Sequence, residues 1–154
     1  MACIAQMVNV LQSVILTDGE KMIKTPTYHV FHMYRHHQGA DLLGSSITGT
    51  SEIGVEDGFK VPDLTESVSE KDGIITITVS NQSLTDAKEL DVVFAEKKNF
   101  EIVEAKVVGG EDPHAFNTFD APENVIEKSF ENYKTEGGLK LNIPAASVVE
   151  IRLK

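Results

Sequence analysis

Three histidines have the most suggestive spacing for chemistry in this sequence. His29, His32 and His36 recur at i, i+3 and i+7, so in a helix their imidazoles share one face and could bind a metal ion. That face lies opposite an apolar stripe, where polar residues are expected in any case, and no carboxylate is placed to complete a ligand set. We therefore predict no metal, and a zinc or nickel site at these histidines is kept as an alternative.

Other reactive side chains lack a setting for catalysis. The single cysteine, Cys3, excludes an internal disulfide and paired-cysteine zinc sites, and without a nucleophile signature it is predicted to be a packing residue. Hydrolysis of a glycosidic bond needs two carboxylates about 5 to 10 Å apart. The acids here fall mainly at outward strand positions or in loops, where they are expected to be solvated. Asn81-Gln82-Ser83 matches a glycosylation acceptor but is equally explained as a turn. We predict no catalytic residue and no cofactor in this chain.

Charge separates the 154 residues into two segments. The net charge of −10, from 24 acidic and 14 basic residues, disfavours nucleic acid and anionic membrane surfaces as partners. Residues 1–50 are neutral, so residues 51–154 carry the whole net charge, and the change falls in the Gly-, Ser- and Thr-rich connection Gly44–Thr50. The longest apolar runs are far shorter than the about 20 residues that a membrane-spanning helix needs.

The neutral segment is predicted to begin with a helix, as far as about Gln12, and a hairpin. Ser13–Thr17 is a β-branched run that ends at the turn dipeptide Asp18-Gly19, and Met22–Lys24 is the returning strand. The helix would present one apolar face, made of Ile4, Met7, Val8, Leu11 and Ile15. Because this face needs cover, we expect it to fold back on the rest of the chain or to self-associate.

A second helix is predicted after Thr25 and Pro26, which supply a capping hydroxyl and a proline at the first helical position. Gly39 is its predicted end. Its predicted buried stripe consists of Thr27, Val30, Phe31 and Tyr34. One helix–strand–helix unit cannot close a parallel sheet. The segment is therefore interpreted as part of a larger α/β domain, or as a helical hairpin packed on a β-domain.

The acidic segment is predicted to be a run of antiparallel strands. Ile75, Ile77 and Val79 alternate with polar residues, which indicates one buried and one wet face, and the phase slips near Val103, which predicts a β-bulge. Gly109–Pro122 is a long irregular loop. Further strands are predicted at Leu90–Phe94, at Leu139–Ile143 and at Val149–Leu153, the last with Glu150, Arg152 and Lys154 pointing outward. Short strands separated by turns favour an antiparallel sandwich or jelly roll.

Several stretches together resemble the C-terminal part of the α-L-arabinofuranosidases of glycoside hydrolase family 51. The most specific begins at Ala2–Gln12 and continues to Thr25–Phe31, and the weakest covers Leu43–Glu66. The matching stretches are Ala2–Gln12, Ile15–Gly19, Lys21–Met22, Thr25–Phe31, Gly73–Asn81, Asn117–Phe119 with Pro122 and Val125, and Ile143–Val149.

The resemblance implies a mainly β fold, an antiparallel β-sandwich of jelly-roll type, preceded by an α/β remnant of a TIM barrel. Residues 1–38 would be the end of the (β/α)8 barrel, with a late helix, strand 8 and the last helix, and residues 39–154 would be the C-terminal β-sandwich domain. The family's two catalytic glutamates would lie before Met1. Thr25 stands where some relatives place a glutamine in the arabinose pocket, and it is the site residue expected near substrate. The strand-end rule for barrels makes Leu16–Thr25 the part nearest the substrate.

The function implied by the resemblance is that of a non-catalytic portion of a retaining enzyme, inactive by itself. The intact parent would hydrolyse terminal non-reducing α-L-arabinofuranosyl residues in arabinan or arabinoxylan fragments. Its partners would be arabinose-containing oligosaccharides, the rest of the barrel and other copies in a homo-oligomer, in the bacterial cytoplasm. A free-standing carbohydrate-binding or structural β-sandwich module is the alternative.

Overall fold

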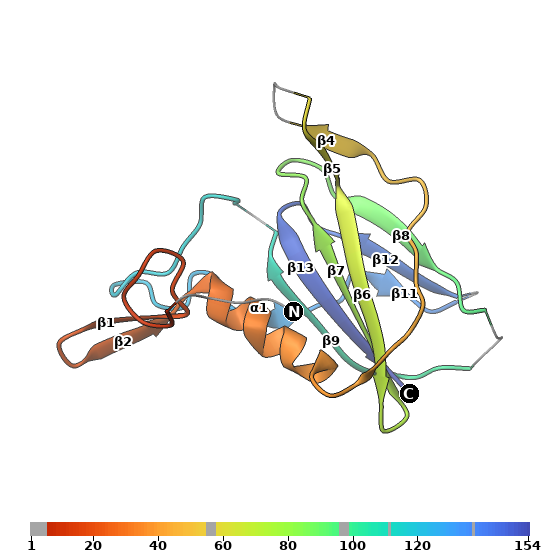
Figure 1. The fold of residues 1–154 in the computed structure, drawn as a ribbon, viewed down its shortest axis with the longest axis horizontal. Helices are drawn as coiled ribbons and strands as arrows, with labels where there is room; N and C mark the ends of the chain where they lie inside the picture. The colour runs from red at the N-terminus through yellow and green to blue at the C-terminus, as the bar shows by residue number, and fades with distance from the viewer. Residues whose placement is uncertain (1–5, 55–57, 96–98, 111, 137) are drawn as a thin grey trace.

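Antiparallel strands dominate the computed structural model, which describes residues 6–54, 58–95, 99–110, 112–136 and 138–154 (Figure 1). The larger sheet has six strands in the order β10–β9–β13–β7–β6–β3. Its strands are β10 (Lys128–Ser129), β9 (Ile102–Gly109), β13 (Ser147–Leu153), β7 (Ile74–Asn81), β6 (Leu64–Lys71) and β3 (Asp41–Leu42). The prediction of a mainly β, antiparallel fold is confirmed for the described residues.

A three-stranded sheet and two hairpins complete the strands. The three-stranded sheet consists of β11 (Tyr133–Lys134), β12 (Leu139–Ile143) and β8 (Lys88–Val92), in that order. The hairpins are β1 (Ile15–Asp18) with β2 (Lys21–Lys24), and β4 (Glu52–Gly54) with β5 (Lys60–Pro62). The described residues contain one α-helix, α1 (Pro26–Tyr34), which a 3-10 turn at Arg35–His37 extends. Residues 26–37 are called the helical segment below.

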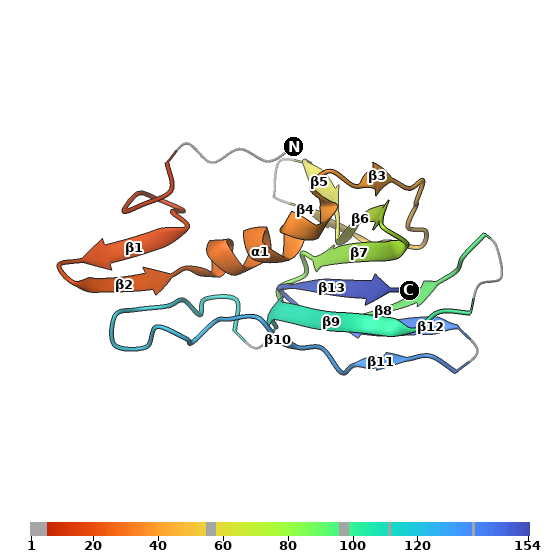
Figure 2. The same cartoon turned by 90° about the horizontal axis from the view of Figure 1, so that it is seen from below.

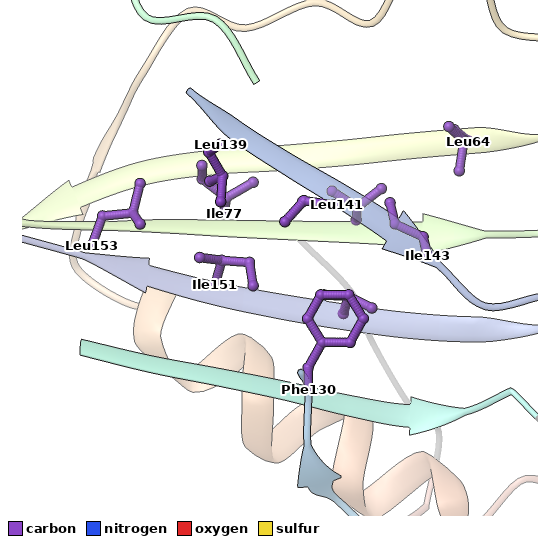
Figure 3. Packing of buried hydrophobic residues seen from close by; sticks show 10 residues of the cluster. Leu64, Ile77, Phe130, Leu139, Leu141, Ile143, Ile151 and Leu153 are labelled. Atoms are coloured by element: carbon purple, nitrogen blue, oxygen red, sulfur yellow. The ribbon is translucent and has the colours of Figure 1, made fainter. Parts of the chain in front are cut away.

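The hydrophobic core lies between the two larger sheets. Leu139, Leu141 and Ile143 of β12 point toward Ile77 of β7 and Ile151 of β13 (Figure 3). The alternation predicted for these strands is confirmed, because each strand places every second residue in the core. The other buried members of the cluster are Leu64, Val79, Phe130, Val149 and Leu153.

The second face of the six-stranded sheet is covered as well, which the sequence pattern did not predict. The core side chains lie on one side of β13 and β9, and α1 lies on the other (Figure 3). Thr76 and Thr78 are therefore buried, although they alternate with apolar residues and were expected to face water. Glu150, expected to point into solvent, is buried too. The helical segment shields these polar side chains, so strand alternation alone gave the wrong exposure.

Residues 6–12 form turns and bends, so the predicted helix through Gln12 is wrong for the described part, and residues 1–5 lie outside it. Asn9 and Gln12 have φ angles of 53° and 61°, in the left-handed region. Val8 forms an isolated bridge with Ile15, and Asn9 Oδ1 accepts a hydrogen bond from Thr17 N at 2.7 Å. Main-chain pairing with the following strand thus replaces the helical hydrogen bonds.

The hairpin and the start of α1 agree with prediction. β1 and β2 pair in register from Ile15 with Lys24 to Asp18 with Lys21, and Gly19 in the turn has a φ of 57°. Thr25 caps α1, with Pro26 at the first position. Regular helix ends at His37, two residues before Gly39, whose φ is 67°. The hairpin extends away from the larger sheets beyond α1 (Figure 2).

The predicted β-bulge is confirmed at Val103. Arg152 pairs with Glu104 and Leu153 pairs with Ile102, so Val103 has no partner in β13. The extra residue keeps Ile102 before the bulge and Ala105 after it against the same core.

Candidate functional site

Every histidine of the helical segment contacts a polar side chain of the β-rich part. His29 and His32 approach Glu127, which immediately precedes β10, and His36 approaches Glu150 of β13. His37 lies 2.7 Å from Ser69 Oγ through Nδ1 and 2.9 Å from Thr78 Oγ1 through Nε2. The face predicted to be solvated is therefore the one that packs on the sheet.

The predicted apolar stripe of α1 is wrong. Met33 is the one residue of α1 that is fully buried, while Phe31, predicted to be buried, is exposed. Thr27, Val30 and Tyr34 are only partly buried. The helical segment therefore docks through two kinds of contact, the buried side chain of Met33 and imidazoles that meet carboxylate and hydroxyl oxygens.

Glu127 binds two histidines and a lysine. Its Oε1 lies 2.6 Å from His32 Nδ1 and 3.4 Å from His29 Nδ1, and its Oε2 lies 3.5 Å from Lys106 Nζ. Burial by itself would raise the pKa of Glu127, but the bonds from His32 and His29 and the charge of Lys106 outweigh it and hold the pKa below its usual range. Glu127 is therefore an ionised anchor for the helical segment.

Glu150 has a different environment. Its side chain is 1% exposed, Oε1 lies 2.8 Å from His36 Nδ1, and Oε2 has no hydrogen-bond partner among the described residues. Burial raises the pKa of Glu150 above its usual range, against the opposing effect of His36. A buried carboxylate with an unpartnered oxygen is costly in its charged form.

The three histidines predicted as an alternative metal site do not meet at one point, since they divide between Glu127 and Glu150. The sequence spacing places no carboxylate to complete a ligand set, but the fold brings Glu127 and Glu150 against these histidines. Donor atoms of His36, Glu104 and Glu150 all lie within 4.8 Å of one another. However, Glu104 already binds Lys106 at 2.7 Å and Arg152 at 3.2 Å, and these two positive charges oppose a divalent cation there. This cluster is an ion-pair network.

Two carboxylates thus converge, but not as a glycosidase pair. Burial would raise the pKa of Glu104, yet the bonds from Lys106 and Arg152 outweigh it and keep the pKa low. Neither Glu104 nor Glu150 lines the cavity near the first hairpin or the groove beside β8 that are described below. Sequence patterns missed Glu104, Glu127 and Glu150 because acids at alternate strand positions or in loops ordinarily face water.

The cavity nearest the hairpin has a volume of about 520 Å³, and its walls include Tyr28, His32 and Glu127. Lys24 Nζ lies 4.7 Å from the Tyr28 ring centroid, and His32 stacks on the same ring at 5.9 Å. The ring and the carboxylate are therefore already engaged with neighbouring side chains. The other cavity, about 710 Å³, is a mainly apolar groove between β6, β7 and β8, and its walls also include Glu66 and Asp91.

Thr25, predicted to lie near substrate, has a structural role in the described chain. Its hydroxyl donates a hydrogen bond to Ser13 O at 2.7 Å and accepts one from Tyr28 N at 3.4 Å. A position near substrate stays a prediction. Cys3 lies outside the described residues.

Asn81, the glycosylation acceptor by pattern, is buried and structural. Its Nδ2 donates hydrogen bonds to the main-chain oxygens of Asp86, Ile143 and Pro144, at 2.9, 3.3 and 2.9 Å. The turn interpretation accounts for this residue.

Comparisons with known proteins match nearly the whole chain. Residues 1–147 match the family described as alpha-L-arabinofuranosidase C-terminal domain. The chain belongs to this family. An intracellular exo-alpha-L-arabinofuranosidase of Bacteroides ovatus is 36% identical over 156 residues, which cover 100% of this chain and 30% of that protein.

Solved structures extend the likeness to the fold. A glycoside hydrolase family 51 arabinofuranosidase from Xanthomonas axonopodis pv. citri superposes with a TM-score of 0.88 at 34% identity, over 97% of this chain and 30% of that one. A family 51 alpha-L-arabinofuranosidase from Bifidobacterium longum shares the fold, with a TM-score of 0.82 at 20% identity, over 97% of this chain and 30% of that one.

The arabinofuranosidase C-terminal domain is thus a part of larger proteins, since this chain spans about 30% of the length of each of these relatives. In the part of the chain that the structure describes, no helix has the length and apolar character needed to cross a membrane.

Proposed function

We propose that this chain is the C-terminal, non-catalytic portion of a retaining α-L-arabinofuranosidase. The intact parent would remove terminal non-reducing α-L-arabinofuranosyl groups from arabinan or arabinoxylan fragments inside the bacterial cytoplasm. The observation that carries the proposal is the match of the whole chain to 30% of an exo-alpha-L-arabinofuranosidase at 36% identity. That relative is an intracellular enzyme, which supports the location.

We further propose the domain division given by the resemblance. Residues 1–38 would be the end of the catalytic barrel, and residues 39–154 a jelly-roll sandwich beside it. The helical segment would then be the last barrel helix, and its contacts with Glu127 and Glu150 would fix the barrel to the sandwich. Exposed apolar side chains around the first hairpin, including Met7, Leu11 and Met22, support this division, because the rest of a larger protein would cover them.

The chain alone is expected to be inactive. The two acids that come together, Glu104 and Glu150, are engaged by Arg152, Lys106 and His36, so they are not free to act as an acid and a nucleophile. We expect purified chain to hydrolyse 4-nitrophenyl α-L-arabinofuranoside no faster than buffer. Hydrolysis that disappears on replacing one of its own acids, such as Glu104→Gln, would contradict the proposal.

A positive test uses the coding sequence upstream of the Met1 codon. We expect that sequence, expressed in one polypeptide with this chain, to encode barrel strands with two strand-end glutamates and to give an active enzyme. Glutamine at either glutamate should abolish turnover.

The alternative function, a free-standing sugar-binding module, predicts a different behaviour of the isolated chain. It requires saturable binding of arabino-oligosaccharides by the isolated chain, measured by calorimetry, whereas we expect none. Within the active longer protein, Thr25→Ser should preserve the cap hydroxyl, and an increase in KM with unchanged folding would support a place for Thr25 near the sugar.

A further inference from the structure

We propose that His36 and Glu150 share one exchangeable proton, and that the docking of the helical segment on the six-stranded sheet weakens when this proton is lost as pH rises. The inference concerns the helix–sheet contact itself and does not depend on the proposed function.

The geometry of the pair is the first argument. His36 belongs to the 3-10 turn and Glu150 to β13, 114 residues later, and their atoms Nδ1 and Oε1 are 2.8 Å apart. The glutamate is 1% exposed and the histidine 16%, so water has little access to the contact. Because Oε2 of Glu150 has no hydrogen-bond partner in the part of the chain that the structure describes, an ionised Glu150 leaves part of its charge unsolvated.

The charges that surround the pair are the second argument. Strand β9 contributes Glu104 and Lys106, and β13 contributes Arg152 beside Glu150. Glu127, which precedes β10, contributes a third carboxylate through Lys106. Three carboxylates therefore face two permanent positive charges, and a single proton balances them when the histidines are neutral. Strand β7 places uncharged Thr76 and Thr78 opposite Arg152 and Glu150, so it adds no charge.

The remaining elements add no better counter-charge. His37, beside His36, bonds to the hydroxyls of Ser69 and Thr78, and burial together with His36 lowers the pKa of His37, which favours its neutral form. Lys71 of β6 is exposed, with its Nζ 3.1 Å from Gln38 O. The helical segment itself contributes His29 and His32, which contact Glu127, and Arg35, which is exposed.

The sign of the effect follows from linkage. Burial raises the pKa of Glu150, so the folded chain holds this proton more tightly than the unfolded chain does. The stabilisation is fully present below the ordinary glutamate pKa and is lost as pH rises through the higher value of the folded state. Glu127 behaves oppositely, since its pKa is lowered, and its stabilisation is lost as pH falls. The two histidine–glutamate contacts of one helical segment therefore respond to pH with opposite signs.

The test compares these two glutamates in the full 154-residue chain, in buffers with EDTA. Side-chain carboxyl carbons, observed by NMR in the unmodified chain, should titrate above the ordinary glutamate pKa at Glu150 and below it at Glu127. A Glu150 that titrates at or below Glu127 would overturn the proposal, and this measurement requires no variant.

Hydrogen exchange then reports on docking. The exchange rates are first corrected for the intrinsic rates of the amides. Protection of the α1 amides, relative to the β12 amides, should then fall from pH 5 to pH 8. The fall should be about tenfold for each unit by which the pKa of the pair in the folded chain exceeds its value in the unfolded chain. Glu150→Gln should remove this decline, whereas the matched control Glu127→Gln should keep it. If Glu150→Gln does not fold, the carboxyl titration of the unmodified chain decides the matter by itself. A decline that persists in the Glu150→Gln chain would refute the shared proton.

Discussion

Asn117 joins the long loop to the first hairpin, because its Nδ2 donates a hydrogen bond to the main-chain oxygen of Lys24 at 2.8 Å. The same amide donates to Val125 O at 2.9 Å and accepts from Val125 N at 2.6 Å. One buried side chain therefore closes the loop and attaches it to a segment 93 residues earlier. Figure 1 shows the loop and the hairpin side by side.

Replacing this amide should loosen both segments. We expect Asn117→Ala to lower the free energy of unfolding by about 1–3 kcal/mol, because buried main-chain groups lose their partners. Urea unfolding measures the loss, and proteolysis should become faster within residues 112–127. The control is Asn124→Ala, which removes one exposed bond to Phe116 O and should change stability by less than about 0.5 kcal/mol. Equal effects of the two variants would contradict the role of Asn117.

Met33 is the apolar anchor of the helical segment, with no exposed surface. We expect Met33→Ala to cost about 2–5 kcal/mol, because it removes a fully buried side chain. Met22, 58% exposed on the hairpin, provides the matched control, and Met22→Ala should be nearly neutral. Thermal and urea unfolding compare the two. A neutral Met33→Ala would mean that the helical segment is not held by this contact.

The position of Gly109, at the end of β9, does not tolerate a side chain. Its φ is 90°, and a Cβ there would collide with the main-chain oxygen of Ala146. We expect Gly109→Ala to destabilise the chain by at least about 2 kcal/mol, from strain and a backbone shift together. Gly19→Ala is the control, since its φ is 57° but no atom lies within 4 Å of the new Cβ, and its cost should be about 1 kcal/mol. The difference in unfolding free energy isolates the collision.

Asp63 and Lys88 should make stability depend on acid pH. Asp63 Oδ2 lies 2.7 Å from Lys88 Nζ, and Oδ1 accepts a hydrogen bond from Ser51 N at 3.0 Å. The bond and charge of Lys88 lower the pKa of Asp63, so its stabilisation is present above the ordinary aspartate pKa and is lost as pH falls through the folded value.

Asp63→Asn should therefore lower Tm at pH 7, by about 3 °C or more, and this deficit should shrink below pH 4. Asp91→Asn, at an exposed pair with Lys140, should leave Tm nearly unchanged at both pH values. A deficit for Asp63→Asn that stays constant with pH would exclude ionisation of Asp63 as its cause.

The exposed apolar residues around the first hairpin do not fold back on the strands. Leu11 is 93% exposed and Met22 58% exposed. We expect the isolated chain to self-associate through this surface, and sedimentation velocity should show that Leu11→Ser with Met22→Ser shifts it toward the monomer. The paired change Thr48→Ser with Thr50→Ser, in the connection, is the control. A monomeric unmodified chain at high concentration would contradict the expectation.

Sequence patterns predicted those parts of the fold that depend on local rules. The hairpin at Asp18-Gly19, the cap at Thr25 and the bulge at Val103 each follow from the conformational preferences of a few neighbouring residues. The strand alternation of β12 and β13 was likewise readable, because one face of each strand packs in the core.

The candidate site was not predictable in the same way. Period-2 alternation cannot reveal that a helix covers the polar face of β7, so Thr78 and Glu150 were assigned to solvent. The pattern of α1 was equally ambiguous, because histidine is found both in water and bonded to buried carboxylates. Only the tertiary arrangement identifies His36 and Glu150 as partners. The helix expected before Ser13 failed because Asn9 and Gln12 adopt left-handed conformations that a periodic pattern does not report.

Because α1 and its 3-10 turn cover the polar side of the six-stranded sheet, a shortened chain that starts at residue 39 would leave this side of the sheet uncovered. Thr76, Thr78 and Glu150 would become exposed to solvent, and the surface against which Met33 packs would lose its cover. Anyone trimming this protein for crystallisation or for fusion to another enzyme should therefore cut before the first hairpin, not at the apparent boundary after the helix.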